Sequence, residues 1–409
     1  MKILVQKFGG TSLATPELRE RVAHHVRTAL DEGYRLVVVV SAMGRKGAPY
    51  ATDTLLEWVK NNGDALPPRE MDLLLHCGEI ISASVLASLL RSKGIDCCVL
   101  TGGQAGIITN NDHTNAQIIT VNPVRVRQEL EKGRVPIVAG FQGRTTEGEI
   151  TTLGRGGSDT TATALGVALG AEMVDIFTDV NGIMTADPRI VEDAVALNTV
   201  TYTEMCNLAF QGAKVIHPRA VEIAMQTNVP IRVRSTLADS PGTLVTNQGE
   251  VNRLAGEVND RLITGITQVP GVTQIKVHAG EGQYDLQLKV FKAMAENGIS
   301  IDFINVNPSG VAYTVFDEWA DRAEALLRDL GFEAELNRNC AKVSAVGAGI
   351  AGVPGVMAKI VEALTDEDIQ ILQSADSHTT IWVLVRGEDM HKAVRALHRK
   401  FELHKIHYQ

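Results

Sequence analysis

The segment Lys2–Leu13, KILVQKFGGTSL, carries the signal on which the fold prediction rests. Its apolar run Ile3–Val5 predicts a buried strand, and Lys7 and the pair Gly9-Gly10 follow it. Glycines let a backbone turn tightly, and the N–H groups of such a turn, with the next helix N-terminus, favour an anion. The segment therefore predicts a phosphate-binding turn. A purely structural turn is the alternative, because neither the Walker GxxxxGK[ST] pattern nor the dinucleotide GxGxxG pattern is present.

Composition limits the protein classes to which the chain can belong. With 409 residues, 44% hydrophobic and 21% charged, it reads as a globular protein of two or three domains. A net charge of -9 without a basic block argues against nucleic acid as the main partner. The five cysteines form no CxxC motif, so we expect reduced thiols and a cytoplasmic location. We expect neither a membrane span nor a signal peptide, because no apolar run reaches about 20 residues and the chain opens on a strand.

Strands and helices alternate from the first segment to about residue 245. Thr15-Pro16-Glu17 predicts a helix start, and apolar runs such as Leu36–Val40, Val135–Phe141 and Val174–Thr178 predict buried strands. This alternation predicts an α/β domain with a mainly parallel open sheet flanked by helices. Because ligands bind at the carboxyl ends of the strands in such sheets, we expect the functional residues in the loops that follow the strands.

A shorter cycle of elements appears twice after a polar stretch, 246–261, which predicts a linker. We place the first copy at 262–338 and the second at 339–409, because Lys292 and Ile299 correspond to Glu362 and Ile369 at an offset of 70 residues. Each copy is interpreted as a ferredoxin-like βαββαβ unit. Both small-ligand sensing and structural dimerisation fit such a pair. Separate strands are expected at 332–336, 342–346 and 369–374, with a short extended end after Phe401.

Several loops and one helix carry residues suited to charged ligands. In TTLGRGGSDTT, residues 151–161, Arg155 suits a carboxylate or phosphate, and Ser158 and Asp159 suit a helix N-cap. Glu79 lies in an otherwise apolar helix, either on an exposed face or as the partner of a substrate ammonium. No histidine among residues 24, 25, 76, 113 and 217 has metal-ligand spacing, and no GxSxG is present, so we expect neither a zinc site nor a serine nucleophile.

Seven motifs follow one another along the chain. They are KFGGTS (7–12), SAMG (41–44), GE (78–79), VAGFQG (138–143), TTLGRGGSDTTA (151–162), FTDVNGIMTADPR (177–189) and GAKVIHPRA (212–220). In this order they closely resemble the aspartate kinase (aspartokinase) family of the amino acid kinase fold. The resemblance continues into CAKVSAVGAGI (340–350) and the repeated units, which are similar to that family's tandem ACT domains. It implies a catalytic domain at 1–245, a linker at 246–261, and ACT domains at 262–338 and 339–409.

The resemblance implies the reaction ATP plus L-aspartate giving ADP plus 4-phospho-L-aspartate, with Mg²⁺, on the route to lysine, threonine and methionine. The residues that would bind ATP are Lys7, Gly9, Gly10, Thr178, Asp179, Met184, Arg189 and Lys214. Met184 stands where many family members have an aromatic residue. Those that would bind aspartate are Ser41, Thr52, Glu79, Arg155 and Ser158. Lys7, Asp159 and Lys214 would be catalytic, with Asp159 orienting the lysines or the metal, and no direct protein ligand to the metal is predicted.

The chemistry of the acceptor agrees with this assignment. A carboxylate has a pKa of about 4, so it is ionised near neutral pH and needs no general base. Catalysis then comes from positioning and from neutralising phosphoryl charge, which fits the lack of a histidine constellation. Three alternatives remain: a kinase acting on glutamate, an amino-acid sensor with a silent kinase half, and a nucleotide-binding scaffold.

The doubled C-terminal units imply feedback control by lysine, threonine or both, and a homo-oligomer formed through the ACT domains. In this family the units pair across subunits, and one unit can borrow a terminal strand. We expect an effector pocket that uses a helix N-terminus for a carboxylate and Asp302 for an ammonium. Its predicted residues are Gln283, Tyr284, Ser300, Ile301 and Asp302, with Gln373 and Ser374 from the second unit.

Overall fold

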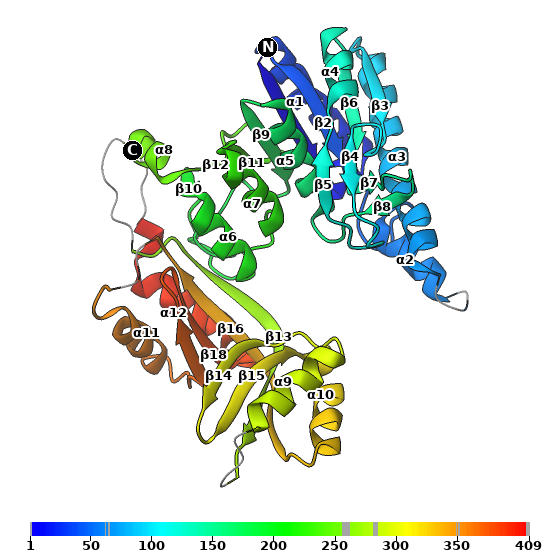
Figure 1. Cartoon of the computed structure of the whole chain (residues 1–409). Coiled ribbons are helices and arrows are strands. Elements are labelled where there is room, and N and C mark those ends of the chain that lie inside the picture. Colours follow the sequence, from blue (N-terminus) through cyan, green and yellow to red (C-terminus); the bar gives the residue numbers. More distant parts are fainter. Residues whose placement is uncertain are drawn as a thin grey trace. The chain divides into compact units, whose positions relative to one another are not determined.

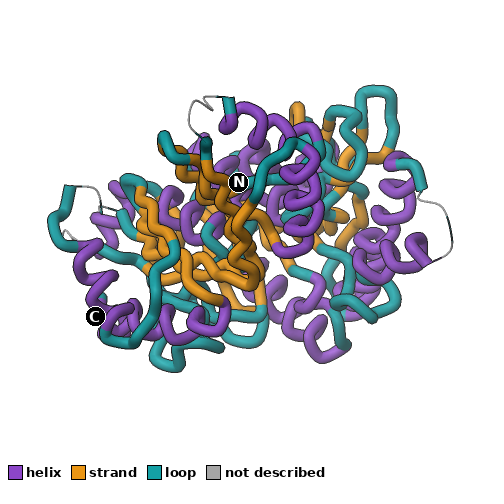
Figure 2. The backbone as a smooth tube through the Cα atoms, turned by 90° about the horizontal axis from the view of Figure 1, so that it is seen from below, coloured by secondary structure: helices purple, strands orange, loops and turns teal. Residues whose placement is uncertain are grey.

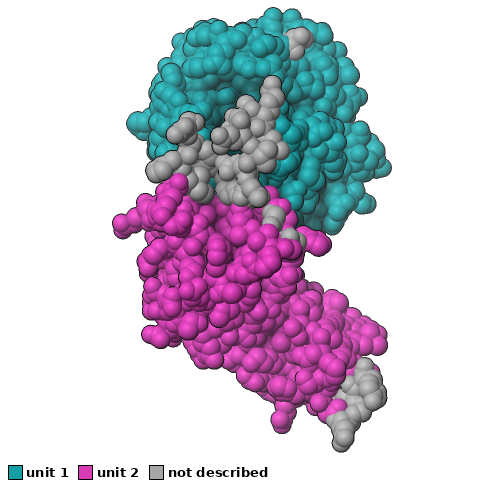
Figure 3. Space-filling view, turned by 90° about the vertical axis from the view of Figure 1, so that its left-hand side faces the viewer, with its two compact units in different colours: residues 1–184, 196–210, 214–259 teal, residues 185–195, 211–213, 260–409 magenta. Residues whose placement is uncertain are grey.

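The computed structural model describes residues 2–61, 63, 66–255, 262–280, 285–348, 350 and 352–405. The chain forms two compact units, which Figure 3 colours separately. The first unit comprises residues 1–184, 196–210 and 214–259, and the second comprises residues 185–195, 211–213 and 260–409. Two short segments from the middle of the chain thus belong to the second unit, which the sequence did not suggest.

An eight-stranded sheet forms the centre of the first unit (Figure 1), with the order β10-β12-β11-β9-β1-β2-β6-β3. Its strands are β1 Ile3–Phe8, β2 Arg35–Val40, β3 Cys97–Leu100, β6 Val135–Ala139, β9 Met173–Thr178, β10 Thr199–Thr201, β11 Ile231–Ser235 and β12 Thr243–Thr246. All neighbours pair parallel except β11 and β12. In β1, Lys7 lies opposite Val39 of β2 and Ile176 of β9. The mainly parallel sheet is the predicted fold class.

The first unit also contains helices, and Figure 2 distinguishes helices, strands and loops by colour. These helices are α1 Pro16–Asp31, α2 Thr52–Asn61, α3 Pro68–Ser92, α4 Val124–Glu131, α5 Gly157–Leu169, α6 Tyr202–Phe210, α7 Pro218–Thr227 and α8 Gln248–Ala255, with the 3₁₀ turn η1 Gly10–Leu13. The N-cap Thr15 accepts a hydrogen bond from the Leu18 amide, and Val22 and Val26 are buried, as the sequence pattern predicted. Helix α8 lies within the stretch that was expected to be a linker.

Helix α3 is long and apolar enough to cross a membrane by length and composition. However, its residues Ala83, Leu86 and Leu90 are buried in the core of the first unit together with side chains of α1 and β2. The apolar character of α3 is therefore explained by packing against the sheet. Helix α3 also packs against β8, a strand of a smaller four-stranded sheet. That sheet has the order β5-β4-β7-β8, with β4 Ile107–Thr109, β5 Ile118–Val121, β7 Gln142–Arg144 and β8 Ile150–Thr152.

The second unit contains a six-stranded antiparallel sheet with the order β14-β15-β13-β16-β18-β17. Its elements are β13 Gly265–His278, α9 Leu286–Glu296, β14 Asp302–Asn307, β15 Gly310–Phe316, α10 Asp317–Asp329, β16 Ala334–Val346, α11 Val356–Thr365, β17 Gln373–Asp376, β18 Thr380–Arg386 and α12 Met390–Lys400. The 3₁₀ turns η2 Gly387–Asp389 and η3 Leu403–Lys405 complete it. Strands β15 and β18 differ by 70 residues, the predicted repeat offset.

The two repeats share strands. The first half of β13, Gly265–Pro270, pairs with Ala341–Val346, whereas Gln274–Val277 pairs with Ala334–Asn337, and register shifts separate the two parts. Each half of β13 also packs into a different core, one around α11 and α12 and the other around α9 and α10. The first repeat is thus inserted behind the first strand of the second. The two strands predicted at 332–336 and 342–346 are consequently one strand, β16.

Two other predicted elements differ from the structure. The strand expected at 369–374 is β17, Gln373–Asp376, because Asp368 has φ 55° and Ile369 is buried in the core without strand pairing. An apolar run buries its side chains in either arrangement, so the sequence pattern did not separate them. In the end expected to be extended, Leu403–Lys405 forms η3 after Glu402 with φ 53°, and residues 406–409 lie outside the described residues.

Candidate functional site

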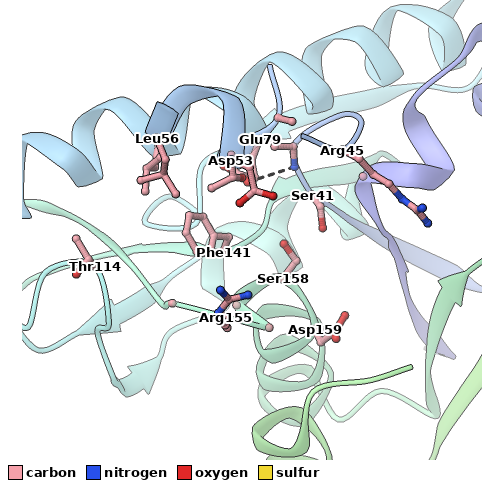
Figure 4. Close-up of a pocket in the computed structure, with 18 of the residues that line it drawn as sticks. Ser41, Arg45, Asp53, Leu56, Glu79, Thr114, Phe141, Arg155, Ser158 and Asp159 are labelled. Atoms are coloured by element: carbon pink, nitrogen blue, oxygen red, sulfur yellow. Dashed lines mark hydrogen bonds between the residues drawn. The ribbon is translucent and has the colours of Figure 1, made fainter. Parts of the chain in front are cut away.

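The main candidate site is a cavity of about 680 Å³ in the first unit (Figure 4). It opens at the carboxyl ends of β1 and β2, where ligands bind in parallel sheets. The residues that line it come from six stretches of chain: Lys7 and Gly10; Ser41, Ala42, Gly44, Arg45, Ala51, Thr52, Asp53 and Leu56; Met71, Leu75 and Glu79; Thr114 and Asn115; Phe141; and Gly154, Arg155, Gly156, Gly157, Ser158 and Asp159. All five predicted aspartate-binding residues are among them.

A lysine and a carboxylate meet at one end of this cavity. The Lys7 ammonium on β1 lies 2.7 Å from Asp159 Oδ1, and both side chains are largely buried. Asp159 sits in the first turn of α5, and its Oδ2 accepts a hydrogen bond from the His217 amide at 3.2 Å. The carboxylate therefore fixes the lysine at the cavity wall, where the N-terminus of α5 adds the favourable dipole end for an anion.

The two glycines that follow β1 play different parts. A Cβ on Gly10 would lie 2.3 Å from the Ala42 carbonyl oxygen, and the Gly44 amide donates to the Gly10 carbonyl at 2.9 Å. Only glycine permits this approach between the turn after β1 and the turn after β2. A Cβ on Gly9 would meet its nearest atom, Lys7 Nζ, at an ordinary 3.5 Å. Gly10 therefore permits the turn after β1 to pack against the turn after β2, whereas Gly9 leaves space next to Lys7.

Glu79 faces the cavity from α3. Its side chain is buried, and Oε1 accepts a hydrogen bond from the Ala42 amide at 3.2 Å. Oε2 is buried and has no hydrogen-bond partner among the described residues. Burial raises the pKa of Glu79 to about 8, against the smaller lowering effect of backbone hydrogen bonds. A buried carboxylate with a free oxygen in a cavity is suited to a cationic ligand such as an ammonium.

Arg155 faces the cavity from the opposite side in Figure 4, in the loop that leads into α5. Its side chain is exposed and makes no ion pair with the described residues, so it is available to an anionic group. Gly154 and Gly156 flank it with φ 72° and 70°, and a Cβ on Gly156 would come within 2.1 Å of the His217 ring. These left-handed positions hold the arginine at the cavity.

A buried polar network, which no sequence pattern predicted, supports the wall next to Arg155. Asp72 of α3 is fully buried and accepts hydrogen bonds from the Thr152 hydroxyl at 2.5 Å and the Thr114 amide at 3.1 Å. His113 Nδ1 lies 2.8 Å from its other oxygen. Thr114, with φ 71°, lines the cavity. Asp72 lies seven residues before Glu79 on the same helix, and that two-turn spacing on an apolar helix was the available signal.

The predicted nucleotide residues are only partly brought together. Thr178 and Asp179 line a second cavity of about 470 Å³, which shares Gly44 and Arg45 with the first. Asp179 forms an exposed ion pair of 2.6 Å with Arg45. Met184 lines neither cavity and forms an isolated bridge with Ala196, and Lys214 is exposed.

Arg189 belongs to the second unit. There its guanidinium lies 2.7 Å from the Asp187 carboxylate. The hydrogen bonds that Arg189 donates lower the pKa of Asp187. Neither cavity of the first unit includes it in its lining.

The predicted effector residues lie in the second unit. Asp302 forms an ion pair with the Lys342 ammonium, and with Ser300 both line a cavity of about 50 Å³. The Gln373 side chain donates to the Phe303 carbonyl at 2.6 Å and accepts from Gln274 at 2.8 Å. Ile301 packs against the core around α9 and α10, and Ser374 lies exposed in β17. Gln283 and Tyr284 lie outside the described residues.

Comparisons with known proteins cover both units. Residues 2–235 match the amino acid kinase family and residues 335–399 match the ACT domain. The chain is 58% identical to aspartokinase 1 of Bacillus subtilis (strain 168) over 405 residues, which are 99% of this chain and 100% of the relative. A crystal structure of E. coli aspartokinase III in complex with aspartate and ADP (R-state) is similar with TM-score 0.79 and 26% identity, covering 98% of this chain and 99% of that one. Its complex with lysine and aspartate (T-state) gives TM-score 0.77 and 26% identity, covering 98% and 100%.

Proposed function

Because the chain belongs to the aspartokinase family, a family of kinases, we propose that it transfers the γ-phosphoryl group of ATP to the side-chain carboxylate of L-aspartate. One observation carries the proposal. A single cavity holds a buried carboxylate, Glu79, and a free arginine, Arg155, on opposite sides, with the Lys7–Asp159 pair at its end. An α-amino acid with a second carboxylate presents one ammonium and two anionic groups, and this set of charges complements it.

The residues divide the work by charge. Glu79 receives the α-ammonium and Arg155 the α-carboxylate, so that the side-chain carboxylate points towards Lys7. One of its oxygens attacks the γ-phosphorus, the bond from phosphorus to the bridging oxygen breaks, and the electron pair leaves with ADP. No proton moves, because the attacking carboxylate is already ionised. Lys7 and the amides of the Gly9-Gly10 turn and the α5 N-terminus neutralise the charge on the transferred group.

Mg²⁺ fits this site as a companion of the ATP phosphates. When bound, it would supply positive charge that neutralises part of the phosphate charge. Of the carboxylates that line the cavity, Glu79 is deeply buried and Asp159 is engaged by both Lys7 and the His217 amide. Asp159 and Asp53 would therefore hold the ion through water, in keeping with the many waters that Mg²⁺ retains in proteins.

The test is a phosphoryl-transfer assay on the purified protein with aspartate and, in parallel, glutamate. We expect ADP and an acyl phosphate from aspartate. Faster turnover of glutamate would establish the alternative acceptor, and no turnover of either would favour a sensor or scaffold.

Feedback by lysine, threonine or both is the second part of the proposal. Its support is the pair of ACT-like repeats and the similarity to an enzyme crystallised with lysine. In this chain Asp302 already pairs with the Lys342 ammonium, so an effector ammonium would replace Lys342 or use another acceptor. Titrating lysine, threonine and both, while following activity and melting temperature, tests the proposal. Unchanged values in all three titrations contradict it.

We also propose a homo-oligomer formed through the second unit. The edge strand β14 leaves Ile304 and Val306 about half exposed, and an uncovered apolar edge strand is a ready pairing surface. Light scattering after size-exclusion chromatography gives the number of subunits, and a monomer at micromolar concentration would contradict the proposal. We also propose a cytoplasmic location, which subcellular fractionation would test. The same reaction would be the first step towards lysine, threonine and methionine, and growth without these amino acids would test that role.

A further inference from the structure

Two histidines and one aspartate come together in the second unit, far from one another in the sequence. His398 lies in α12, His404 in η3, and Asp193 in the segment 185–195. Their nearest ligand atoms all lie within 4.8 Å of one another. His398 Nδ1 is 3.9 Å from Asp193 Oδ1, and His404 Nδ1 is 4.0 Å from Asp193 Oδ2. None of the sequence patterns brought these residues together.

The fold builds this cluster from well-packed parts. Glu402, with φ 53°, reverses the chain after α12 and brings His404 back towards His398. Ile190 and Val191 of the segment 185–195 are buried in the same core as Leu397 and Leu403. Each ligand thus lies within three residues of a buried core residue, whereas the Asp193 side chain itself is 66% exposed and free to adjust.

The polar atoms of the cluster are not satisfied by one another. Separations of 3.9 and 4.0 Å are too long for hydrogen bonds, whose donor–acceptor distances are about 2.7–3.2 Å. His404 Nδ1 is buried and has no hydrogen-bond partner among the described residues. His398 is 1% exposed, and its other nitrogen, Nε2, lies 2.9 Å from the Thr185 hydroxyl. Two imidazole nitrogens and a carboxylate oxygen therefore lie within 4.8 Å of one another without hydrogen bonds between them.

We propose that these three side chains form a binding site for a divalent transition-metal ion of the Zn²⁺ type. Imidazole nitrogen with one carboxylate is a typical zinc ligand set, and hard ions such as Mg²⁺ prefer oxygen only. Bonds of about 2.0–2.2 Å place tetrahedral donors roughly 3.3–3.6 Å apart. The three ligand atoms lie within 4.8 Å of one another, so their widest separation must shorten by at most about 1.5 Å. The exposed Asp193 side chain can supply that movement. Water would occupy the fourth position.

The contact between His398 and Thr185 supports the assignment. Metal-ligating histidines usually donate their second ring N–H to an outer partner, which fixes the ring. The Thr185 hydroxyl oxygen is held by the Val195 amide at 3.0 Å and is placed to accept from His398 Nε2. Bound metal would tie the segment 185–195 to the C-terminal helix, and thereby link two parts of the second unit that are about 200 residues apart in sequence.

Cobalt binding to the chelator-treated, full-length protein tests the site. We expect one Co²⁺ per chain with the strong visible absorption of tetrahedral coordination, displaced by Zn²⁺, and a Zn²⁺-dependent rise in melting temperature. His404→Gln and Asp193→Asn should each remove the absorption band and the melting shift. Thr185→Val, which keeps all three ligands, should weaken the affinity about 10–100-fold.

His391→Gln is the matched control, because His391 is an exposed histidine of the same helix α12. It should bind Co²⁺ as the parent does. The proposal is overturned if the parent shows no stoichiometric tetrahedral Co²⁺ spectrum, if the spectrum survives in both His404→Gln and Asp193→Asn, or if His391→Gln loses it equally.

Discussion

Glu79 offers the sharpest test of how the cavity selects its ligand. Burial raises the pKa of its carboxyl to about 8 from an ordinary value of 4.5. At pH 7, about one tenth of the empty protein then has an ionised Glu79, the form that pairs with an ammonium. If aspartate binds only that form, its apparent affinity rises about ninefold from pH 6 to 7 and about fivefold from pH 7 to 8, and then levels off, with about one proton released on binding at pH 7.

The assay is isothermal titration calorimetry with aspartate at pH 6, 7, 8 and 9, in buffers of different ionisation enthalpy. Glu79→Gln should bind aspartate weakly and without a pH-dependent step, because the ligand's own ammonium stays charged over this range. The control is Glu70→Gln, a half-exposed glutamate of the same helix, which should behave as the parent. Affinity that is independent of pH in the parent, or unchanged in Glu79→Gln, would refute the reasoning.

The same carboxyl has a cost in stability, with a defined sign. Because the pKa of Glu79 is raised in the folded state, ionisation of this carboxyl destabilises the folded protein. The loss of unfolding free energy is absent below pH 4.5, grows above it and is complete above pH 8. At about 1.4 kcal/mol per pKa unit the penalty reaches at most about 5 kcal/mol. An unpaired buried amide costs about 1–3 kcal/mol at every pH. Relative to the parent, Glu79→Gln should therefore gain stability between pH 5.5 and 8.5, and a pH-independent difference would contradict the assigned pKa.

Three further substitutions test other parts of the site. Lys7→Met should lower kcat by about 10²–10³-fold, because it removes a fixed positive charge next to the transferred phosphoryl group. The control Lys2→Met, at an exposed ion pair with Glu172, should leave kcat unchanged. Equal rates for both variants would contradict the role of Lys7. Gly10→Ala should lower the melting temperature and the activity, since its Cβ would meet the Ala42 carbonyl oxygen at 2.3 Å. The control Gly9→Ala should keep the melting temperature of the parent. Equal melting temperatures of the two variants would show that Gly10 is not needed for packing. Asp72→Asn should raise KM for aspartate and destabilise the protein by about 1–3 kcal/mol, and the exposed Asp112→Asn serves as its control in the same assays.

The sequence predicted a local feature well where the residue type in question has a single structural explanation. Lys7, the glycine turn and the buried apolar strands led to a parallel sheet with a cavity at its carboxyl edge, and that arrangement is confirmed. Asp72 and His113 escaped prediction because the two-turn spacing of Asp72 and Glu79 places both on one helix face but does not say whether Asp72 is buried or exposed. The difference lies in Thr114 and Thr152, which reach Asp72 only through the fold. The cluster of Asp193, His398 and His404 was hidden for the same reason.

Strand sharing between the two repeats of the second unit was not predicted for a different reason. An alternating apolar strand records which side faces a core, but it does not record which neighbour supplies the hydrogen bonds. β13 is one continuous strand, yet its halves pair with different parts of β16 and pack into different cores. A slip of either half of β13 by one residue would turn the side chains of that half away from the core of its repeat. The register shifts between Pro270 and Gln274 let each half of β13 keep the pairing of its own repeat, so that one strand serves both repeats.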